Sequence, residues 1–115
     1  MKFESKNIGT QYEILKRKLG GELFAPVTLD GTAFTNGVCK AGVPITAEGK
    51  IDNGTGSEEK TSVAVGILLN DVYDETPNGT IVKAFACVNE ANCNKNAGIT
   101  LDASVKKALP LIVFE

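Results

Sequence analysis

Glycine and proline interrupt this sequence at such short intervals that a bundle of long helices is not expected. The chain has 12 Gly and 4 Pro in 115 residues, and it contains no Trp. Both residue types mark turns, so the stretches between them have the length of short strands. The composition is 43% hydrophobic and 23% charged, which is enough apolar material for one core. We therefore expect a single mostly β domain, a small β-barrel or β-clip-like fold with one short C-terminal helix and an N-terminal arm.

Three apolar runs of strand length are expected to form the sheet. Residues 63–69 are rich in β-branched side chains and should be buried on both faces, with Gly66 marking a bulge or a close backbone approach. Residues 81–88 follow a turn region and are expected to pair with 63–69. Residues 111–114 should pair into the sheet as well, since four apolar side chains would otherwise be exposed.

Turns, loops and one helix are expected between these strands. Residues 22–46 predict brief edge strands, 44–51 a hairpin, and the polar, Gly-rich residues 52–62 an exposed loop. A further polar loop is expected at 89–92. Residues 102–109 begin with an Asp, carry lysines in the last turn and precede a proline, which predicts a short helix.

The first 20 residues are expected to form an arm that is distinct from a domain at 21–115. The arm carries a net charge of +3 and the domain −5. A Thr-x-x-Glu capping box that starts at Thr10 predicts a short helix, but the β-favouring Tyr12 and Ile14 leave an extended conformation open. A segment this short cannot bury its apolar groups alone, so it is expected to need a partner.

The composition also bears on partners and location. An acidic body with a mildly basic arm and few aromatic residues disfavours nucleic-acid binding. No window approaches the roughly 18 apolar residues of a membrane span. The residues after Met1 have no apolar signal region, and three cysteines are an odd count, so we expect a soluble protein with free thiols, made in a reducing cytoplasm.

The residue types that support most enzyme chemistry are missing or badly spaced. Histidine is absent, which excludes Ser-His-Asp and Cys-His nucleophiles and histidine zinc sites. The cysteines lack Cys-x2-Cys spacing, and no Gly-rich nucleotide loop is present. The acidic groups Glu58-Glu59 and Asp71, Asp74 and Glu75 match no calcium loop and are expected to be solvated. A lysine nucleophile stays open, but the hypothesis is a protein without catalytic activity, cofactor or metal.

A series of features in fixed order distinguishes residues 22–115. They are the 41–50 hairpin, the Ala-Val-Gly-Ile-Leu-Leu strand at 64–69, Asn-Gly-Thr at 78–80, the stretch at 98–110, and the apolar end at 111–114. This order resembles the bacteriophage lambda-type head decoration proteins, also called capsid cement proteins. Residues 1–20 do not match the arm of the lambda protein.

The resemblance implies a small β domain that binds the outside of an expanded phage head as a homotrimer. It would clamp neighbouring subunits of the major capsid protein against internal DNA pressure. The implied location is the outer capsid surface of the virion, after synthesis in the host bacterial cytoplasm. Nucleic acid and membrane are not expected partners. The arm residues expected to bind the capsid are Phe3, Ile8, Tyr12, Ile14, Leu15 and Arg17.

One alternative belongs to another functional class. A carbohydrate-binding or adhesion module on a virion or cell surface would need aromatic platforms. The chain has no Trp, and its tyrosines are Tyr12 and Tyr73. This composition favours the decoration protein.

Overall fold

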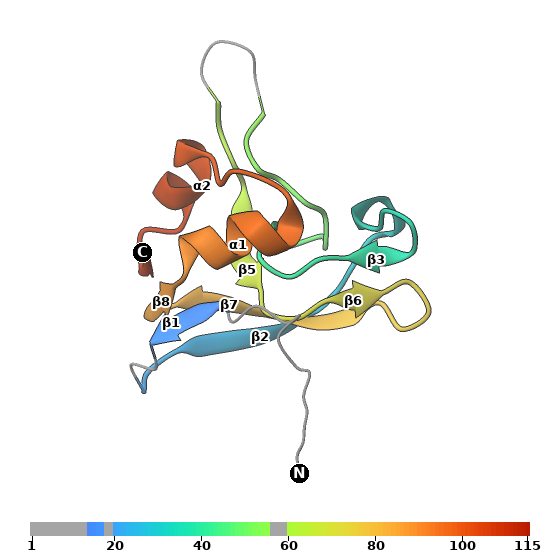
Figure 1. Ribbon diagram of the computed structural model, residues 1–115, viewed down its shortest axis with the longest axis horizontal. Helices are drawn as coiled ribbons and strands as arrows, with labels where there is room; N and C mark the ends of the chain where they lie inside the picture. The colour runs from blue at the N-terminus through green and yellow to red at the C-terminus, as the bar shows by residue number, and fades with distance from the viewer. Residues whose placement is uncertain (1–13, 18–19, 56–59) are drawn as a thin grey trace.

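A computed structural model describes residues 14–17, 20–55 and 60–115, and within these ranges the chain has more β-strand than helix (Figure 1). The strands are β1 (Leu15–Arg17), β2 (Leu23–Thr28), β3 (Val38–Cys39), β4 (Pro44–Thr46), β5 (Ala64–Leu68), β6 (Val72–Tyr73), β7 (Asn78–Ala84), β8 (Ala86–Val88) and β9 (Ile112–Phe114). The helices are α1 (Glu90–Ala97), α2 (Ala103–Ala108) and a short 3-10 helix, η1 (Gly31–Ala33). The expected mostly β class is confirmed.

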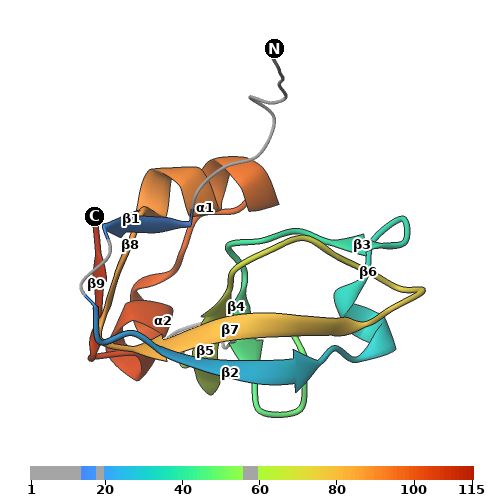
Figure 2. The same ribbon diagram turned by 90° about the horizontal axis from the view of Figure 1, so that it is seen from below.

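The strands of the described residues form three sheets and do not close into a barrel. The largest sheet is antiparallel with the order β2-β7-β5-β4, the second has the order β1-β8-β9, and β3 pairs with β6. Figure 2 shows the large sheet along one side of the molecule, with α1 and β1 on the other side. The barrel expectation is wrong because the chain leaves the large sheet after β7 and continues in the second one.

Two apolar clusters fill the space between these layers. The first lies among β5, β7, β8, β9 and both helices, and includes Ile67, Val82 and Val105. The second lies between the β4-β5 part of the large sheet and the β3-β6 pair, and includes Ile45 and Leu68. These side chains are fully buried. Each contributes roughly 1.5–3 kcal/mol relative to an exposed position, so the two clusters supply the main favourable term in folding.

The expected strand at 63–69 is confirmed as β5, and Gly66 lies where a neighbouring strand comes close. A Cβ atom at Gly66 would lie 2.7 Å from the carbonyl oxygen of Val82 and 2.9 Å from Cδ1 of Ile81. The next residue of β5, Ile67, pairs with Val82. The absence of a side chain at this position therefore lets β5 and β7 pack against each other.

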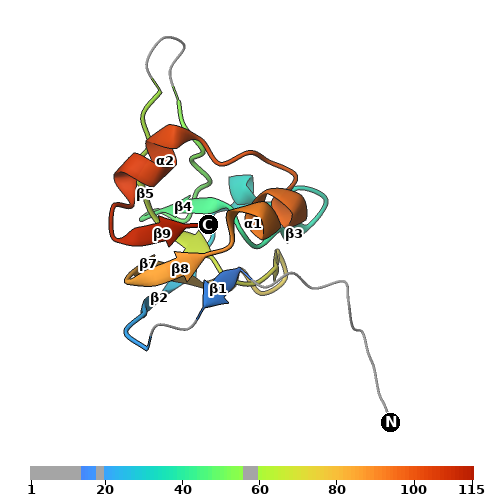
Figure 3. The ribbon, with the colours of Figure 1, turned by 60° about the vertical axis from the view of Figure 1, so that its left-hand side comes forward.

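The run 81–88 was expected to be one strand, but it is divided into β7 and β8 at Phe85. Phe85 has a φ of 57°, in the left-handed region that residues other than glycine rarely adopt. Its N–H donates a hydrogen bond to the carbonyl oxygen of Leu111 at 2.8 Å. This turn directs β8 into the second sheet, where it lies between β1 and β9 (Figure 3).

The polar loop expected at 89–92 is instead the beginning of α1, so the described residues contain two α-helices where one was expected. The Asn89 side chain caps the helix by accepting from the N–H of Asn92 at 3.1 Å, and Gly98, with a φ of 71°, ends it. The helix packs closely on Gly42, where a Cβ atom would lie 2.7 Å from Cα of Cys93. The expected C-terminal helix is confirmed as α2.

Residues 14–17, which were expected to belong to an N-terminal arm, pack against the body. Ile14 is 3% exposed and lies in the first cluster, and Leu15 packs against the same cluster. Leu15 pairs with Val88, and the N–H of Asn89 donates to the carbonyl oxygen of Ile14 at 2.7 Å. Residues 14–17 thus belong to the body and are extended, because pairing with β8 buries Ile14. Residues 1–13 lie outside the described residues.

Candidate protein-binding surface

Several large apolar side chains remain about half exposed on three segments that lie near one another. We call this surface the apolar end: Leu23 and Phe24 at the start of β2, Phe85 between β7 and β8, Leu111 before β9 and Val113 within it. Their exposed fractions lie between 49% and 55%. Leu23 pairs with Ala84, the neighbour of Phe85, and β9 pairs with β8 directly after Phe85.

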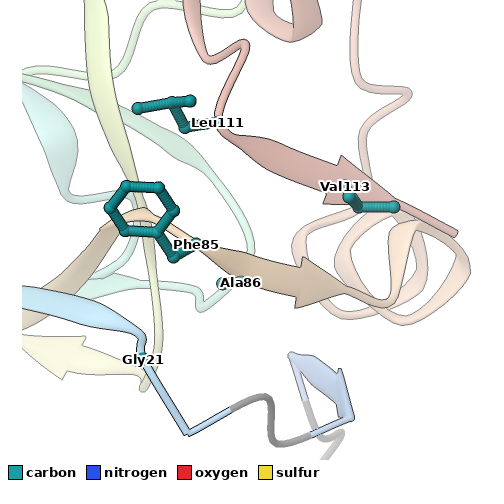
Figure 4. Close-up of a pocket in the computed structure, with 5 residues that line it drawn as sticks. All are labelled: Gly21, Phe85, Ala86, Leu111 and Val113. Atoms are coloured by element: carbon teal, nitrogen blue, oxygen red, sulfur yellow. The ribbon is translucent and has the colours of Figure 1, made fainter.

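A hollow of about 550 Å³ occupies the centre of the apolar end. Its lining consists of Gly21, Phe85, Ala86, Leu111 and Val113. Figure 4 shows the ring of Phe85 and the side chain of Leu111 next to each other above the start of β8, with Val113 further along β9. The hollow is therefore shaped by the turn at Phe85 and by the neighbouring strand β9.

The backbone explains why these apolar groups are not buried. Phe85 is held in the left-handed region by its hydrogen bond to Leu111. Along β9 successive side chains alternate between faces, so Ile112 is 5% exposed whereas Val113 is 52% exposed. The expectation that 111–114 pairs into the sheet is confirmed, but pairing does not bury Leu111 and Val113.

The lining of the hollow limits its chemistry to apolar contact. None of its five residues carries a titratable, nucleophilic or metal-ligating side chain. Small-molecule sites usually add a few convergent polar groups to an apolar wall, and these fix the orientation of the ligand. The charged groups nearby are exposed: Lys83 lies two residues before Phe85, and Lys16 lies 3.9 Å from Glu115. An apolar centre with charges at its margin is typical of a protein-protein contact.

The arm residues expected to bind a capsid do not form one exposed surface in the described part of the chain. Phe3, Ile8 and Tyr12 lie outside the described residues. Ile14 is buried, and Leu15 is partly buried against the core, so neither offers the free apolar contact that was expected. Arg17 lies in β1, where its backbone pairs with Cys87. The core of the body contacts the apolar side chains of Ile14 and Leu15.

Sequence reasoning missed the apolar end, although one signal was present. It treated 111–114 as a strand that had to be fully buried. A sheet that packs on the core with one face leaves its other face in contact with solvent. Successive side chains of a strand point to opposite faces, so every second residue of 111–114 should have been expected to be exposed. The position of Phe85 had no such signal, since aromatic residues favour extended backbone.

The three cysteines are free and buried. Burial, with the nearby Asp71 carboxylate, raises the pKa of the Cys39 thiol to about 11. Burial, with the nearby Glu90 carboxylate, raises the pKa of the Cys93 thiol to about 12. Thiolate is the reactive form, so both groups are protonated and unreactive at neutral pH.

The carboxylates of Asp71 and Asp102 accept hydrogen bonds that hold loops and helix ends in place. Asp71 accepts from the N–H of Ala41 at 2.8 Å and from Nδ2 of Asn96 at 3.1 Å, which ties α1 to the loop before β4. Asp102 caps α2 by accepting from the N–H of Ser104 at 3.0 Å. Hydrogen bonds from Ser104, with the charge of Lys60, lower the pKa of Asp102 below its ordinary value. These contacts account for both carboxylates as structural groups.

Other candidate sites have little support in the described residues. In the described ranges, no three His, Cys, Asp or Glu side chains gather as a metal ion would require. Glu58 and Glu59 lie outside those ranges. Tyr73 is 55% exposed on β6, at the opposite end of the body from β8 and Phe85 (Figure 1). No helix in the described part of the chain is long and apolar enough to cross a bilayer.

Comparison of the chain with family models, with curated proteins and with solved structures gives no match.

Proposed function

We propose that this chain is a structural protein of a phage head. It decorates the outer surface of the expanded shell as a homotrimer, binds the major capsid protein and stabilises the shell against internal DNA pressure. The observation that carries the proposal is the apolar end, an exposed apolar surface suited to the association of copies in a homotrimer. The likeness of residues 22–115 to lambda-type decoration proteins supplies the kind of partner.

The rest of the body supports a binding role over catalysis. Cys39 and Cys93 are buried with raised pKa values, and Asp71 and Asp102 are engaged in structural hydrogen bonds. The described residues that line the hollow at the apolar end carry no polar side chain. The proposal therefore assigns the chain no reaction and no cofactor.

A decoration protein acts through many modest contacts that are repeated over a shell. When one copy of a trimer is bound, the other two copies bind as if at high local concentration, so weak individual contacts give strong overall binding. Loss of one copy's contact then does not release the trimer. Because binding is multivalent, a small domain of 12.1 kDa can stabilise the whole shell against internal pressure.

The carbohydrate-binding alternative receives less support from the arrangement of aromatic residues. Stacking on a sugar requires aromatic faces that lie close to polar groups. The strand that carries Tyr73, β6, lies at the opposite end of the body from β8 in Figure 1, and the described residues that line the hollow beside Phe85 have no polar side chain. Lack of binding to glycan arrays is the result we expect.

The proposal is tested by co-sedimentation with capsids. Expanded heads without decoration protein would be assembled from a major capsid protein whose gene lies next to the gene for this chain. We expect the purified chain to pellet with expanded heads and to saturate. It should not pellet with unexpanded heads, which lack the mature surface lattice. A chain that stays in the supernatant at saturating concentration would refute the proposal.

A further inference from the structure

We propose that the apolar end is the surface through which copies of this chain bind one another. The number of copies, three, rests on the proposed function. The choice of surface rests on the structure alone, which exposes Phe85, Leu111 and Val113, together with Leu23 and Phe24. The capsid is then contacted by other parts of each copy.

The composition of the surface favours another copy of the chain over the capsid. A decoration protein exists free before it meets a shell, and an exposed apolar surface in a free protein promotes aggregation. Contacts between proteins that also exist apart are about as polar as ordinary surface, whereas permanent homo-oligomer contacts are more apolar. Among the described residues, the lining of the hollow consists of Gly, Phe, Ala, Leu and Val. Its character is that of a permanent contact.

The size of the surface also fits a second copy. The five side chains are about half exposed. An aromatic side chain buries about 150–250 Å² and an aliphatic one less, so together the five offer on the order of 400 Å² of apolar surface. A stable interface buries about 800 Å² per partner, and homo-oligomer interfaces are about 65% apolar, which gives roughly 500 Å². The apolar end therefore supplies most of the apolar part of one such contact.

The margin of the apolar end carries charges of both signs. Lys83 is exposed two residues before Phe85, and its side chain lines a separate hollow with Ala25 and Val65. On another part of the margin, Glu115 lies 3.9 Å from Lys16. A surface with both a basic and an acidic margin can complement a second copy of itself, which a uniformly charged partner would not match.

The backbone at Phe85 gives an independent indication of a binding role. A φ of 57° at a non-glycine residue costs free energy, on the order of 1 kcal/mol or more. Asn or Gly would fit this conformation better. The strained turn places an aromatic ring in the lining of the hollow, where it is 49% exposed and belongs to neither apolar cluster. A contact with another copy supplies the stabilisation that the isolated chain lacks.

The inference is tested with the full chain by sedimentation velocity over a wide range of protein concentration. Val113→Asp places a charge in the centre of the apolar end, and Val63→Asp is the matched control, because Val63 is 69% exposed outside it. We expect trimers for the wild type and for V63D. For V113D we expect monomers, with association weakened by at least about tenfold. Circular dichroism should show that V113D retains its fold.

A second variant protects the test against misfolding. Phe85→Asn suits the left-handed backbone, so the single copy should be at least as stable as the wild type, while association should weaken. The melting temperature of the wild type should rise with protein concentration, and that of F85N should not. A wild-type chain that is monomeric, or V113D and F85N proteins that remain trimeric, would overturn the inference.

Binding to heads separates this inference from the proposed function. If the wild-type chain is a trimer that the V113D substitution dissociates, but the wild-type trimer does not pellet with heads, the inference is upheld and the decoration role is refuted. A V113D protein that stays trimeric but no longer binds heads would show that the apolar end contacts the shell. That outcome would overturn the inference and leave the decoration role standing.

Discussion

At the scale of single residues, the clearest constraint lies at Gly66 in the centre of β5. The carbonyl oxygen of Val82 would be only 2.7 Å from a Cβ atom at this position, and Ile81 closes the space beside it. A backbone oxygen cannot rotate away as the end of a side chain can. Any side chain at position 66 must therefore push β5 away from β7.

We expect Gly66→Val to destabilise the fold by roughly 1–3 kcal/mol or more, because it overpacks the contact between two central strands. Gly31→Ala is the control, since a Cβ atom at Gly31 meets nothing within 4 Å. Urea unfolding of both variants at one protein concentration measures the effect. Equal unfolding midpoints for G66V and the wild type would contradict the close packing of β5 and β7.

The buried thiols predict a loss of stability at high pH. In the folded protein the pKa values of Cys39 and Cys93 are about 11 and about 12, above the ordinary value of 9.0 that applies to the unfolded chain. The preference for protonated thiols stabilises the fold fully below pH 9.0 and is lost as the pH rises through these folded-state values.

We expect the wild-type melting temperature to fall between about pH 9 and pH 11 more steeply than that of Cys39→Ala, which lacks one of these thiols. Both proteins contain the same lysines, so lysine titration cancels in the comparison. Thermal melts monitored by circular dichroism across this range provide the measurement. Parallel pH profiles would mean that the Cys39 thiol is accessible to water in the folded protein.

At the scale of elements, β1 determines where the body begins. Ile14 is 3% exposed among residues of the first cluster, and β1 extends the β8-β9 pair to three strands. A chain shortened beyond Ile14 therefore loses both a core side chain and an edge strand.

We expect Ile14→Ala to destabilise the fold by roughly 2–5 kcal/mol, the usual cost of removing a large buried side chain. Deletion of residues 2–12 should leave the unfolding midpoint and the oligomeric state unchanged while weakening binding to heads. Urea unfolding, sedimentation and pelleting with heads measure these effects. An Ile14→Ala protein of wild-type stability would mean that the body begins after β1.

Elements with strong local signals were predictable from the sequence. Residues 63–69 form β5 because a run of apolar, β-branched residues favours a buried strand. The helix α2 follows from the Asp102 cap and the lysines in its last turn. In both cases the pattern of a few neighbouring residues was sufficient.

Elements determined by distant contacts were not predictable. The helix α1 has a single buried residue, Cys93, and three asparagines, which favour helix ends and turns over helix interiors. Its local signals were the caps Asn89 and Gly98. The turn at Phe85 depends on Leu111, which is distant in sequence, and without that turn the hollow of the apolar end would not form.

At the scale of the whole molecule, charge and apolar surface are distributed differently. Residues 1–20 carry a net charge of +3 and residues 21–115 carry −5. The apolar end belongs to the body, and the proposal assigns it to contact between copies. Capsid contact in this account is made by other parts of each copy, among them the residues before Ile14.

The most direct test of this account is a cryo-electron microscopy reconstruction of expanded heads incubated with the purified chain. The account predicts added density at the three-fold and quasi-three-fold positions, into which three copies fit with Phe85, Leu111 and Val113 of each facing a neighbouring copy. Heads without added density, or with single separated copies at other positions, would contradict it.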